Sequence, residues 1–190
     1  MTTPALAAIV YAEGDGPRVD NLLAEVSRAL RLSGTRLAGA VQHNTDGGDR
    51  CRCDMTLEDL SSGRRVDISE KRGPEARGCR LDSFALEEVV GLVGASLATD
   101  PELVILNRFG KREADGAGFR PVIEDALARG VAVLVAVSKG NVAAWDTFAA
   151  ALDRKLDIDA VSVIEWSRGA ARNRNRDYRS LVTARIPGDA

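Results

Sequence analysis

The stretch from Glu102 to Arg120 (ELVILNRFGKREADGAGFR) constrains the fold more than any other part of the chain. It begins with a short apolar run, Leu103 to Leu106, and then turns abruptly polar. A buried strand that leads into a charged loop is typical of open α/β sheets, which bind ligands at the carboxyl ends of their strands. The stretch therefore predicts an α/β fold with a site at the end of this strand. Its polar side chains are the candidates: Asn107, Arg108, Lys111 and Glu113.

Strand patterns alternate with helical patterns along the rest of the chain. The continuous apolar run from Val131 to Val137 is typical of a central parallel strand. Further strands are expected at 5–11 and 37–41. Apolar residues at helical spacing predict helices at 19–30, at 86–97 with Asp82 or Ser83 as the N-cap, at 119–128 and at 141–152. This order predicts a mostly parallel sheet covered by helices.

Composition narrows the class of protein. With 190 residues, 45% of them apolar, the chain fits one α/β domain over 1–190, and the 4% aromatic content disfavours an aromatic-rich β-sandwich. A net charge of −2 argues against general nucleic-acid binding. No apolar stretch approaches the roughly 18 residues of a membrane span, and no basic residue precedes the first apolar run. We therefore expect a cytoplasmic protein without a membrane segment or signal peptide.

The loop after the first strand contains two glycines, Gly14 and Gly16, followed by Arg18. Glycine-bearing loops at a helix N-terminus can bind phosphate through backbone N–H groups. The Walker A pattern G-x-x-x-x-G-K-[ST] is incomplete here, because Arg18 lies near the lysine position, and Asp20 and Asn21 lie near the hydroxyl position. Arg18 would attract an anion and Asp20 would repel it. An anion site and a plain β–α turn both remain open.

Two further segments differ from the α/β pattern. Residues 44–82 are interpreted as a β-hairpin insertion followed by a basic loop, and residues 168–190 as a basic tail that contains Arg172, Arg174 and Arg176. Within the tail region, 159–166 is expected to form a short helix and 181–186 an edge strand. Both segments are either solvated surface or a surface for a protein partner or a second copy of the chain.

The three cysteines are an odd number and do not indicate a secreted disulfide framework. Cys51, Cys53 and Cys79 with the one histidine, His43, could make a four-ligand zinc site. However, a C-x-C pair on a strand points its thiols to opposite faces. No metal site is therefore assigned, and Cys79 is either an inert side chain or a thiol activated by the neighbouring arginines.

Three motifs carry a family resemblance: LAGAVQ (37–42), RGCRLD (78–83) and LVILNRFGKREADGAGFR (103–120). Together they resemble a bacterial family of unknown function that looks distantly like the THEP-type nucleoside-triphosphatases of the P-loop superfamily. The resemblance implies a three-layer P-loop-like α/β fold with a mostly parallel sheet and a nucleotide or oxyanion as ligand. It also suggests a link to molybdenum uptake.

The residues of that superfamily that handle Mg²⁺ and water are changed in this chain. In the THEP-type enzymes the strand ends in an Asp-Glu pair, followed by a glycine and a glutamate. Asn107 and Arg108 stand at the pair, whereas Gly110 and Glu113 match. Both Walker motifs are therefore degenerate, which argues against Mg²⁺ and ordinary hydrolysis.

Three hypotheses follow from the sequence. The first is an oxyanion- or nucleotide-binding protein without standard hydrolysis, with Gly14, Gly16, Arg18, Asn107, Arg108 and Lys111 as ligand-binding residues. The second is an active nucleoside-triphosphatase in which Arg18 replaces the lysine and Glu113 is the catalytic base. The third is a regulatory protein without enzymatic activity.

Overall fold

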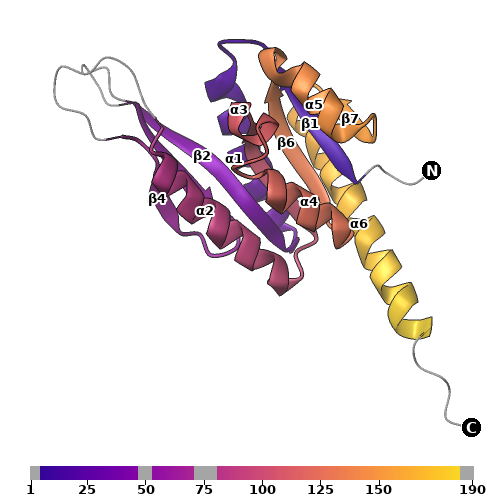
Figure 1. Cartoon of the computed structure of the whole chain (residues 1–190). Helices are drawn as coiled ribbons and strands as arrows, with labels where there is room; N and C mark the ends of the chain where they lie inside the picture. The colour runs from indigo at the N-terminus through magenta and orange to yellow at the C-terminus, as the bar shows by residue number, and fades with distance from the viewer. Residues whose placement is uncertain (1–4, 47–52, 71–80, 185–190) are drawn as a thin grey trace, which may run out of the picture.

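The computed structural model describes residues 5–46, 53–70 and 81–184 (Figure 1). All the named strands in these residues join one seven-stranded sheet in the order β4-β3-β2-β5-β6-β1-β7. The strands are β1 (Leu6–Tyr11), β2 (Leu37–Asp46), β3 (Cys53–Asp59), β4 (Arg65–Asp67), β5 (Leu103–Phe109), β6 (Ala132–Ser138) and β7 (Asp153–Leu156). The pairs formed among β2, β5, β6, β1 and β7 are parallel, so these strands end at the same edge of the sheet.

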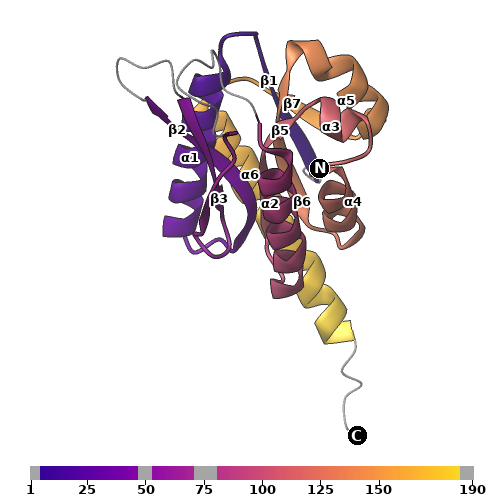
Figure 2. The ribbon, with the colours of Figure 1, turned by 60° about the vertical axis from the view of Figure 1, so that its left-hand side comes forward.

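Helices cover both faces of the sheet and make three layers (Figures 1 and 2). On one face, α1 (Gly16–Leu32) and α6 (Ala160–Ala184) pack in a cluster with residues of β1, β5 and β6. On the other face lie α2 (Ser83–Ser96), α4 (Arg120–Ala128) and α5 (Val142–Ala149). Three short helices complete the fold: η1 (Leu97–Thr99), α3 (Lys111–Ala114) and η2 (Lys139–Asn141). The predicted three-layer α/β fold with a mostly parallel sheet is confirmed.

The sequence explains why these elements form where they do. In β1, Ala7, Ile9 and Tyr11 belong to the core on the α1 face, while Leu6 and Ala8 belong to the core on the α2 face. This division follows from the alternation of side chains along a strand, and a strand buried on both faces must be apolar throughout. In α2, the Asp82 side chain accepts hydrogen bonds from the backbone N–H groups of Phe84 and Ala85, as expected of an N-cap.

The hairpin expected within 44–82 is continuous with the main sheet. β2 continues past the predicted end at Val41 to Asp46, where it pairs antiparallel with β3, and β3 pairs antiparallel with β4. The hairpin therefore extends one edge of the sheet. The basic loop was predicted mainly from residues 71–80, which lie outside the described residues.

In the tail, the predicted helix is confirmed but is longer than expected, and the predicted edge strand was wrong. The predicted short helix at 159–166 is the start of α6, which continues to Ala184 and includes most of the predicted edge strand at 181–186. The actual edge strand next to β1 is β7, which the sequence analysis placed in no strand. No helix in the described part of the chain is both long enough and apolar enough to span a membrane.

Candidate functional site

A cavity of about 360 Å³ lies where β1, β5 and β6 end. The β1–α1 turn, the end of β5 and the residues that follow β6 form its walls. Its lining residues are Tyr11, Glu13, Gly14, Gly16, Pro17, Arg108, Phe109, Gly110, Ser138 and Asn141. The volume is within the range usual for small-molecule sites. This is the edge of the sheet at which the sequence placed a site.

Helix α1 begins at this cavity with Gly16 and Pro17. Asp15 is the N-cap residue, but its side chain caps no backbone N–H among the described residues. The first N–H groups of a helix have no partner within the helix, and the helix dipole makes this end partly positive. The start of α1 therefore offers the cavity N–H donors that no N-cap side chain satisfies.

The dominant charged contact beside the cavity joins Arg108 to Asp20. Arg108 Nη2 lies 3.1 Å from Asp20 Oδ1 and 3.0 Å from Oδ2, and it links the end of β5 to the second turn of α1. Asp20 is only 1% exposed, so little water is available to solvate its carboxylate, and the positive charge of Arg108 largely compensates the negative charge of Asp20. A Cβ on Gly16 would lie 3.2 Å from the same Nη2, so glycine leaves room for the guanidinium.

Amide side chains surround the same carboxylate. Asn107 Nδ2 donates to Asp20 Oδ1 at 3.2 Å, and Asn44 Nδ2 donates to Oδ2 at 2.7 Å. Gln42 completes the network, because its Nε2 donates to Asn44 Oδ1 and its Oε1 accepts from Asn107 Nδ2. Asn107 Oδ1 accepts from the backbone N–H of Gln42 at 3.2 Å. Asn107 is therefore a buried network residue and not a cavity-lining one.

Part of Arg108 remains accessible from the cavity. Its side chain is 43% exposed, and only Nη2 donates to Asp20. Within the described residues, Nε and Nη1 make no hydrogen bond to the protein. Nε and Nη1 lie on different edges of the planar guanidinium, so each can donate a separate hydrogen bond to an oxyanion while Nη2 stays on Asp20.

The opposite wall carries hydroxyl and amide groups. Asn141 Nδ2 donates to Ser138 Oγ at 2.9 Å. Burial raises the pKa of the Tyr11 hydroxyl, Arg108 opposes this rise and Asp20 adds to it. Tyr11 therefore stays protonated at neutral pH and can donate a hydrogen bond. Glu13 also lines the cavity, so the site is not uniformly positive.

Glu113, the predicted catalytic base, is held in a backbone turn. Its Oε2 accepts from Gly110 N at 2.9 Å and its Oε1 accepts from Phe119 N at 3.0 Å. The residue is 5% exposed and does not line the cavity. The two bonds give Glu113 a structural role in the loop between β5 and α4, and its catalytic role stays a prediction.

The structure separates two other predicted residues from the cavity. Lys111 is the exposed first residue of α3 and is absent from the cavity wall. Arg18 lines a different cavity of about 520 Å³, together with Asn21, Leu22, Glu25, Ile158 and Ala160. Of the predicted ligand-binding residues, Gly14, Gly16 and Arg108 line the first cavity.

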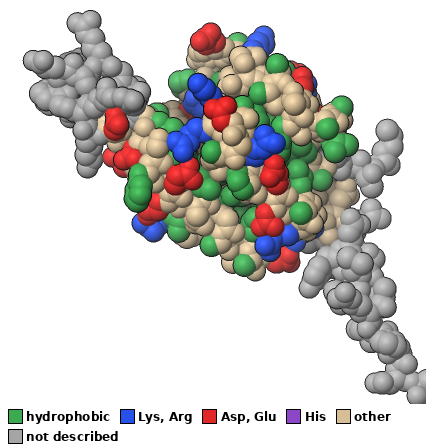
Figure 3. All heavy atoms as spheres, in the orientation of Figure 1, with side chains coloured by type: hydrophobic (Ala, Val, Ile, Leu, Met, Phe, Trp, Pro, Cys, Tyr) green, Lys and Arg blue, Asp and Glu red, His purple; other side chains and the backbone are tan. Residues whose placement is uncertain are grey.

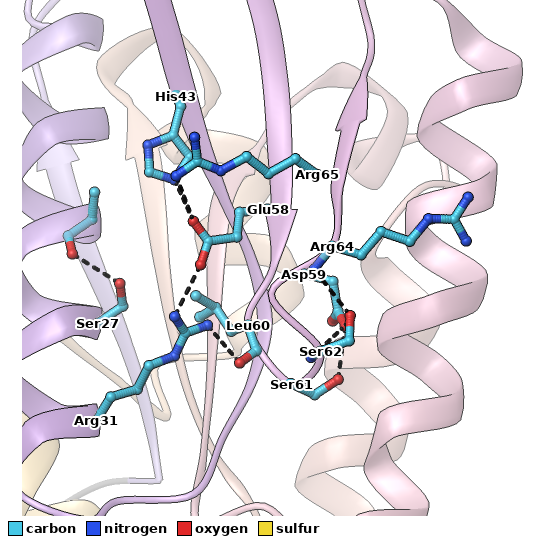
Figure 4. Close-up of polar contacts among 11 residues, drawn as sticks. Ser27, Arg31, His43, Glu58, Asp59, Leu60, Ser61, Ser62, Arg64 and Arg65 are labelled. Carbon is cyan, nitrogen blue, oxygen red and sulfur yellow. Dashed lines mark hydrogen bonds and ion pairs between the residues drawn. The ribbon is translucent and has the colours of Figure 1, made fainter.

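The zinc hypothesis falls mostly outside the described part of the chain, which excludes Cys51, Cys79 and the side chain of Cys53. His43 is described, and its Nε2 lies 2.8 Å from Glu58 Oε2 (Figure 4). In the described ranges, no group of three or more His, Cys, Asp or Glu side chains could hold a metal ion.

The sequence analysis did not assign several residues to the site: Tyr11, Glu13, Gln42, Asn44, Ser138 and Asn141. A signal for one group was present. Ser138 and Asn141 follow the central strand 131–137 as Asn107 and Arg108 follow 103–106, and parallel neighbours end at the same edge. Glu13 and Gly14 follow β1 in the same way.

Residues 6–166 match a protein family described as "Protein of unknown function (DUF2478)", which is most of the chain. The chain belongs to this family. Among curated proteins, the Molybdenum import ATP-binding protein ModC 2 of Bradyrhizobium diazoefficiens is 33% identical over 180 residues. That match covers 93% of this chain but only 20% of ModC 2, so the DUF2478 chain spans about one fifth of its relative.

A solved structure supports the fold. THEP1 from the hyperthermophile Aquifex aeolicus superposes with a TM-score of 0.56 at 15% sequence identity, over 80% of this chain and 89% of THEP1. The predicted likeness to the fold of THEP-type proteins is therefore confirmed, together with the resemblance to a family of unknown function. At this identity the likeness concerns the fold alone.

Proposed function

We propose that the chain binds a small oxyanion, or the phosphate groups of a nucleotide, in the 360 Å³ cavity at the start of α1. The observation that carries this proposal is the guanidinium of Arg108, whose Nη1 makes no hydrogen bond to the described residues and lies 3.7 Å from the Cβ position of Gly16, at the N-terminus of α1. A fixed guanidinium and a helix N-terminus are both groups that bind oxyanions.

The relatives favour the same class of ligand. The fold is P-loop-like, and ModC 2 is named for ATP binding and molybdenum import. Because the chain matches only one fifth of ModC 2, that activity belongs to the larger protein. Molybdate therefore joins phosphate, sulfate, ATP and GTP as a ligand to test.

We further propose that the chain does not perform ordinary nucleoside-triphosphate hydrolysis. The lysine and hydroxyl of a Walker A motif are absent, and Arg18 lies in another cavity. Both oxygens of Glu113 accept backbone hydrogen bonds, and Glu113 does not line the cavity. Phosphoryl transfer depends on positioned cations and a positioned nucleophile.

Nucleic acid is not the proposed partner. Acidic and basic side chains are interspersed over the face drawn in Figure 3, which shows no continuous basic stripe. The chain as a whole has a net charge of −2. A nucleic-acid site would need a clustered basic surface.

Isothermal titration calorimetry with the five ligands, with and without Mg²⁺, tests the proposal. The matched variants are Arg108→Gln and Arg18→Gln, which remove the same charge from different cavities. We expect Arg108→Gln to weaken binding by about tenfold or more, because a charge-assisted hydrogen bond contributes about 1.5 to 3 kcal/mol. Arg18→Gln should change the affinity little. Absence of binding for every ligand, or an equal loss in both variants, would reject the site.

A further inference from the structure

The P-loop resemblance implies Mg²⁺ as a cofactor, and the oxygen atoms beside the cavity decide whether this ion fits. Mg²⁺ takes oxygen ligands in near-octahedral geometry, through carboxylates and waters. The carboxylate nearest to the start of α1 on the buried side of the helix is Asp20, and the residue at the expected acidic position of β5 is Asn107.

Both residues have their oxygens occupied by N–H donors. Asp20 Oδ1 accepts from Arg108 and Asn107, and Asp20 Oδ2 accepts from Arg108 and Asn44. Asn107 Oδ1 accepts from the backbone N–H of Gln42. A metal ion bound to Asp20 would have to displace the Arg108 guanidinium and would be repelled by it. Asp20 and Asn107 therefore do not fit Mg²⁺, and Glu13, which lines the cavity, belongs to no group of three or more His, Cys, Asp or Glu side chains in the described residues that could hold a metal ion.

The guanidinium occupies the place where a cation would be held between the carboxylate and the cavity. Arg108 Nη2 contacts both oxygens of Asp20, and the Arg108 side chain as a whole is 43% exposed. The Asp20 carboxylate holds the guanidinium, and the lack of a Cβ at Gly16 leaves room for it. A guanidinium is charged at every physiological pH, so this cation is permanent.

We propose that the site binds its oxyanion without a divalent cation, with Arg108 as the built-in cation and Asp20 as the positioning residue that orients it. The inference rests on the proposed function, which it deepens. Asp20 acts only through Arg108, whereas Arg108 contacts the ligand directly. Gln42 and Asn44 support the arrangement by holding Asn107 and the Asp20 carboxylate.

Titration of the full chain with inorganic phosphate tests this inference, once in excess EDTA and once in excess MgCl₂. We expect the same affinity in both. Arg108→Gln should lower the affinity by about tenfold or more in both media, in line with the loss of one charge-assisted bond. Arg108→Lys, which keeps the charge but not the fork, should retain measurable metal-independent binding.

A double-mutant cycle tests the role of Asp20. Asp20→Asn should change the phosphate affinity in the wild-type background and leave it unchanged in the Arg108→Gln background, because the effect travels through Arg108. Urea unfolding of each variant separates this coupling from a loss of stability. An equal change in both backgrounds, or none in either, would overturn the positioning role.

The failures of the two proposals are distinguishable. Binding that requires Mg²⁺, or that survives Arg108→Gln unchanged, rejects the built-in cation while keeping an anion-binding protein. Absence of phosphate binding in both media rejects the inference for this ligand. The proposed function itself falls if the nucleotides, sulfate and molybdate also fail to bind, or if Arg108→Gln and Arg18→Gln lose affinity equally.

Discussion

Glu113 illustrates how a buried carboxylate can serve the backbone. Its two oxygens accept hydrogen bonds from Gly110 N and Phe119 N, and so close the loop that follows β5. We expect Glu113→Gln to lower the free energy of unfolding by about 1 to 3 kcal/mol, because the amide replaces one acceptor with a donor that faces an N–H group. Urea denaturation measures this loss.

The control for Glu113 is Glu124→Gln, which changes an exposed carboxylate that pairs with Arg120 one helical turn away. Such surface pairs contribute about 1 kcal/mol or less. A phosphate-release assay run beside the denaturation separates the two roles of Glu113. Nucleotide hydrolysis that is present in the wild type and lost in a fully folded Glu113→Gln variant would support the catalytic assignment and contradict the structural one.

Gly39 is required where β2 passes β5. Its φ is +114°, and a Cβ at this position would lie 1.9 Å from the carbonyl oxygen of Ile105. Gly39→Ala should therefore destabilise the protein by more than about 3 kcal/mol, since the backbone of two paired strands must shift. Gly91→Ala is the matched control, because Gly91 lies within α2 with open space around it. It should stabilise the protein by about 0.5 to 1 kcal/mol. Comparable losses in the two variants would contradict this explanation.

At the residue scale, the sequence predicted part of the cavity wall but not the side chains that hold Arg108 in place. Gly14, Gly16 and Arg108 could be predicted because they follow strands that end at one edge. Arg18 was predicted to join them because it is close to them in the chain. Successive residues of a helix are rotated by about 100° around its axis. Arg18 therefore lies on another face of α1, where it lines the second cavity with Asn21, Leu22 and Glu25. The same rotation places Asp20 on the buried side of α1, and the Arg108 contact depends on tertiary packing that no local pattern contains.

At the element scale, the Glu58 carboxylate joins the hairpin to α1. Glu58 of β3 accepts from Arg31 Nη1 at 2.9 Å, contacts His43 Nε2 at 2.8 Å and contacts Arg65 Nη2 at 3.3 Å (Figure 4). Burial alone would raise the pKa of Glu58, but the hydrogen bonds from Arg31 and His43 outweigh it and lower this pKa below its ordinary value. The charged form of Glu58 is therefore stabilised by folding.

This lowered pKa predicts a pH-dependent contribution to stability. The contribution is fully present above the ordinary glutamate pKa of about 4.3 and is lost as the pH falls through the lower folded value. Glu58→Gln should cost about 1 to 2 kcal/mol at neutral pH, and its difference from wild type should shrink toward about pH 3. Urea denaturation across this range measures it, with Glu88→Gln, an exposed partner of Arg64, as the control. A difference that stays constant with pH would contradict the prediction.

Elements with an apolar run or stripe could be predicted, whereas those stabilised only by their neighbours could not. β7 (DRKL) has a single buried residue, Leu156, and forms because it pairs with β1. α3 has four residues and depends on the turn around Glu113. The second half of α6 lacks an apolar stripe, so its sequence did not indicate that the helix continues. Arginine is nevertheless a good helix former, and this residue recurs there.

At the scale of the whole molecule, the last helix of the described chain, α6, packs against its first helix, α1. It begins after β7, packs beside α1 on one face of the sheet and then extends beyond the sheet (Figures 1 and 2). Val163, Trp166 and Ala170 belong to the core on the α1 face. Arg174 pairs with Asp100, which lies between η1 and β5. The family match ends at residue 166, whereas buried residues of α6 continue to Ala171.

Deleting residues 168–190 should therefore destabilise the fold and not only remove a tail. The deletion removes the buried Ala170 and Ala171 and the contact of Arg174 with Asp100, and it exposes the core around Trp166. We expect the free energy of unfolding to fall by about 2 kcal/mol or more, given about 25 cal/mol for each Å² of apolar surface exposed. Urea unfolding followed by tryptophan fluorescence measures the loss, and Arg174→Ala alone should cost about 1 kcal/mol or less. If the truncated chain is as stable as the full one, the segment after residue 167 does not stabilise the core. Its arginines would then be better explained as a surface that binds a partner.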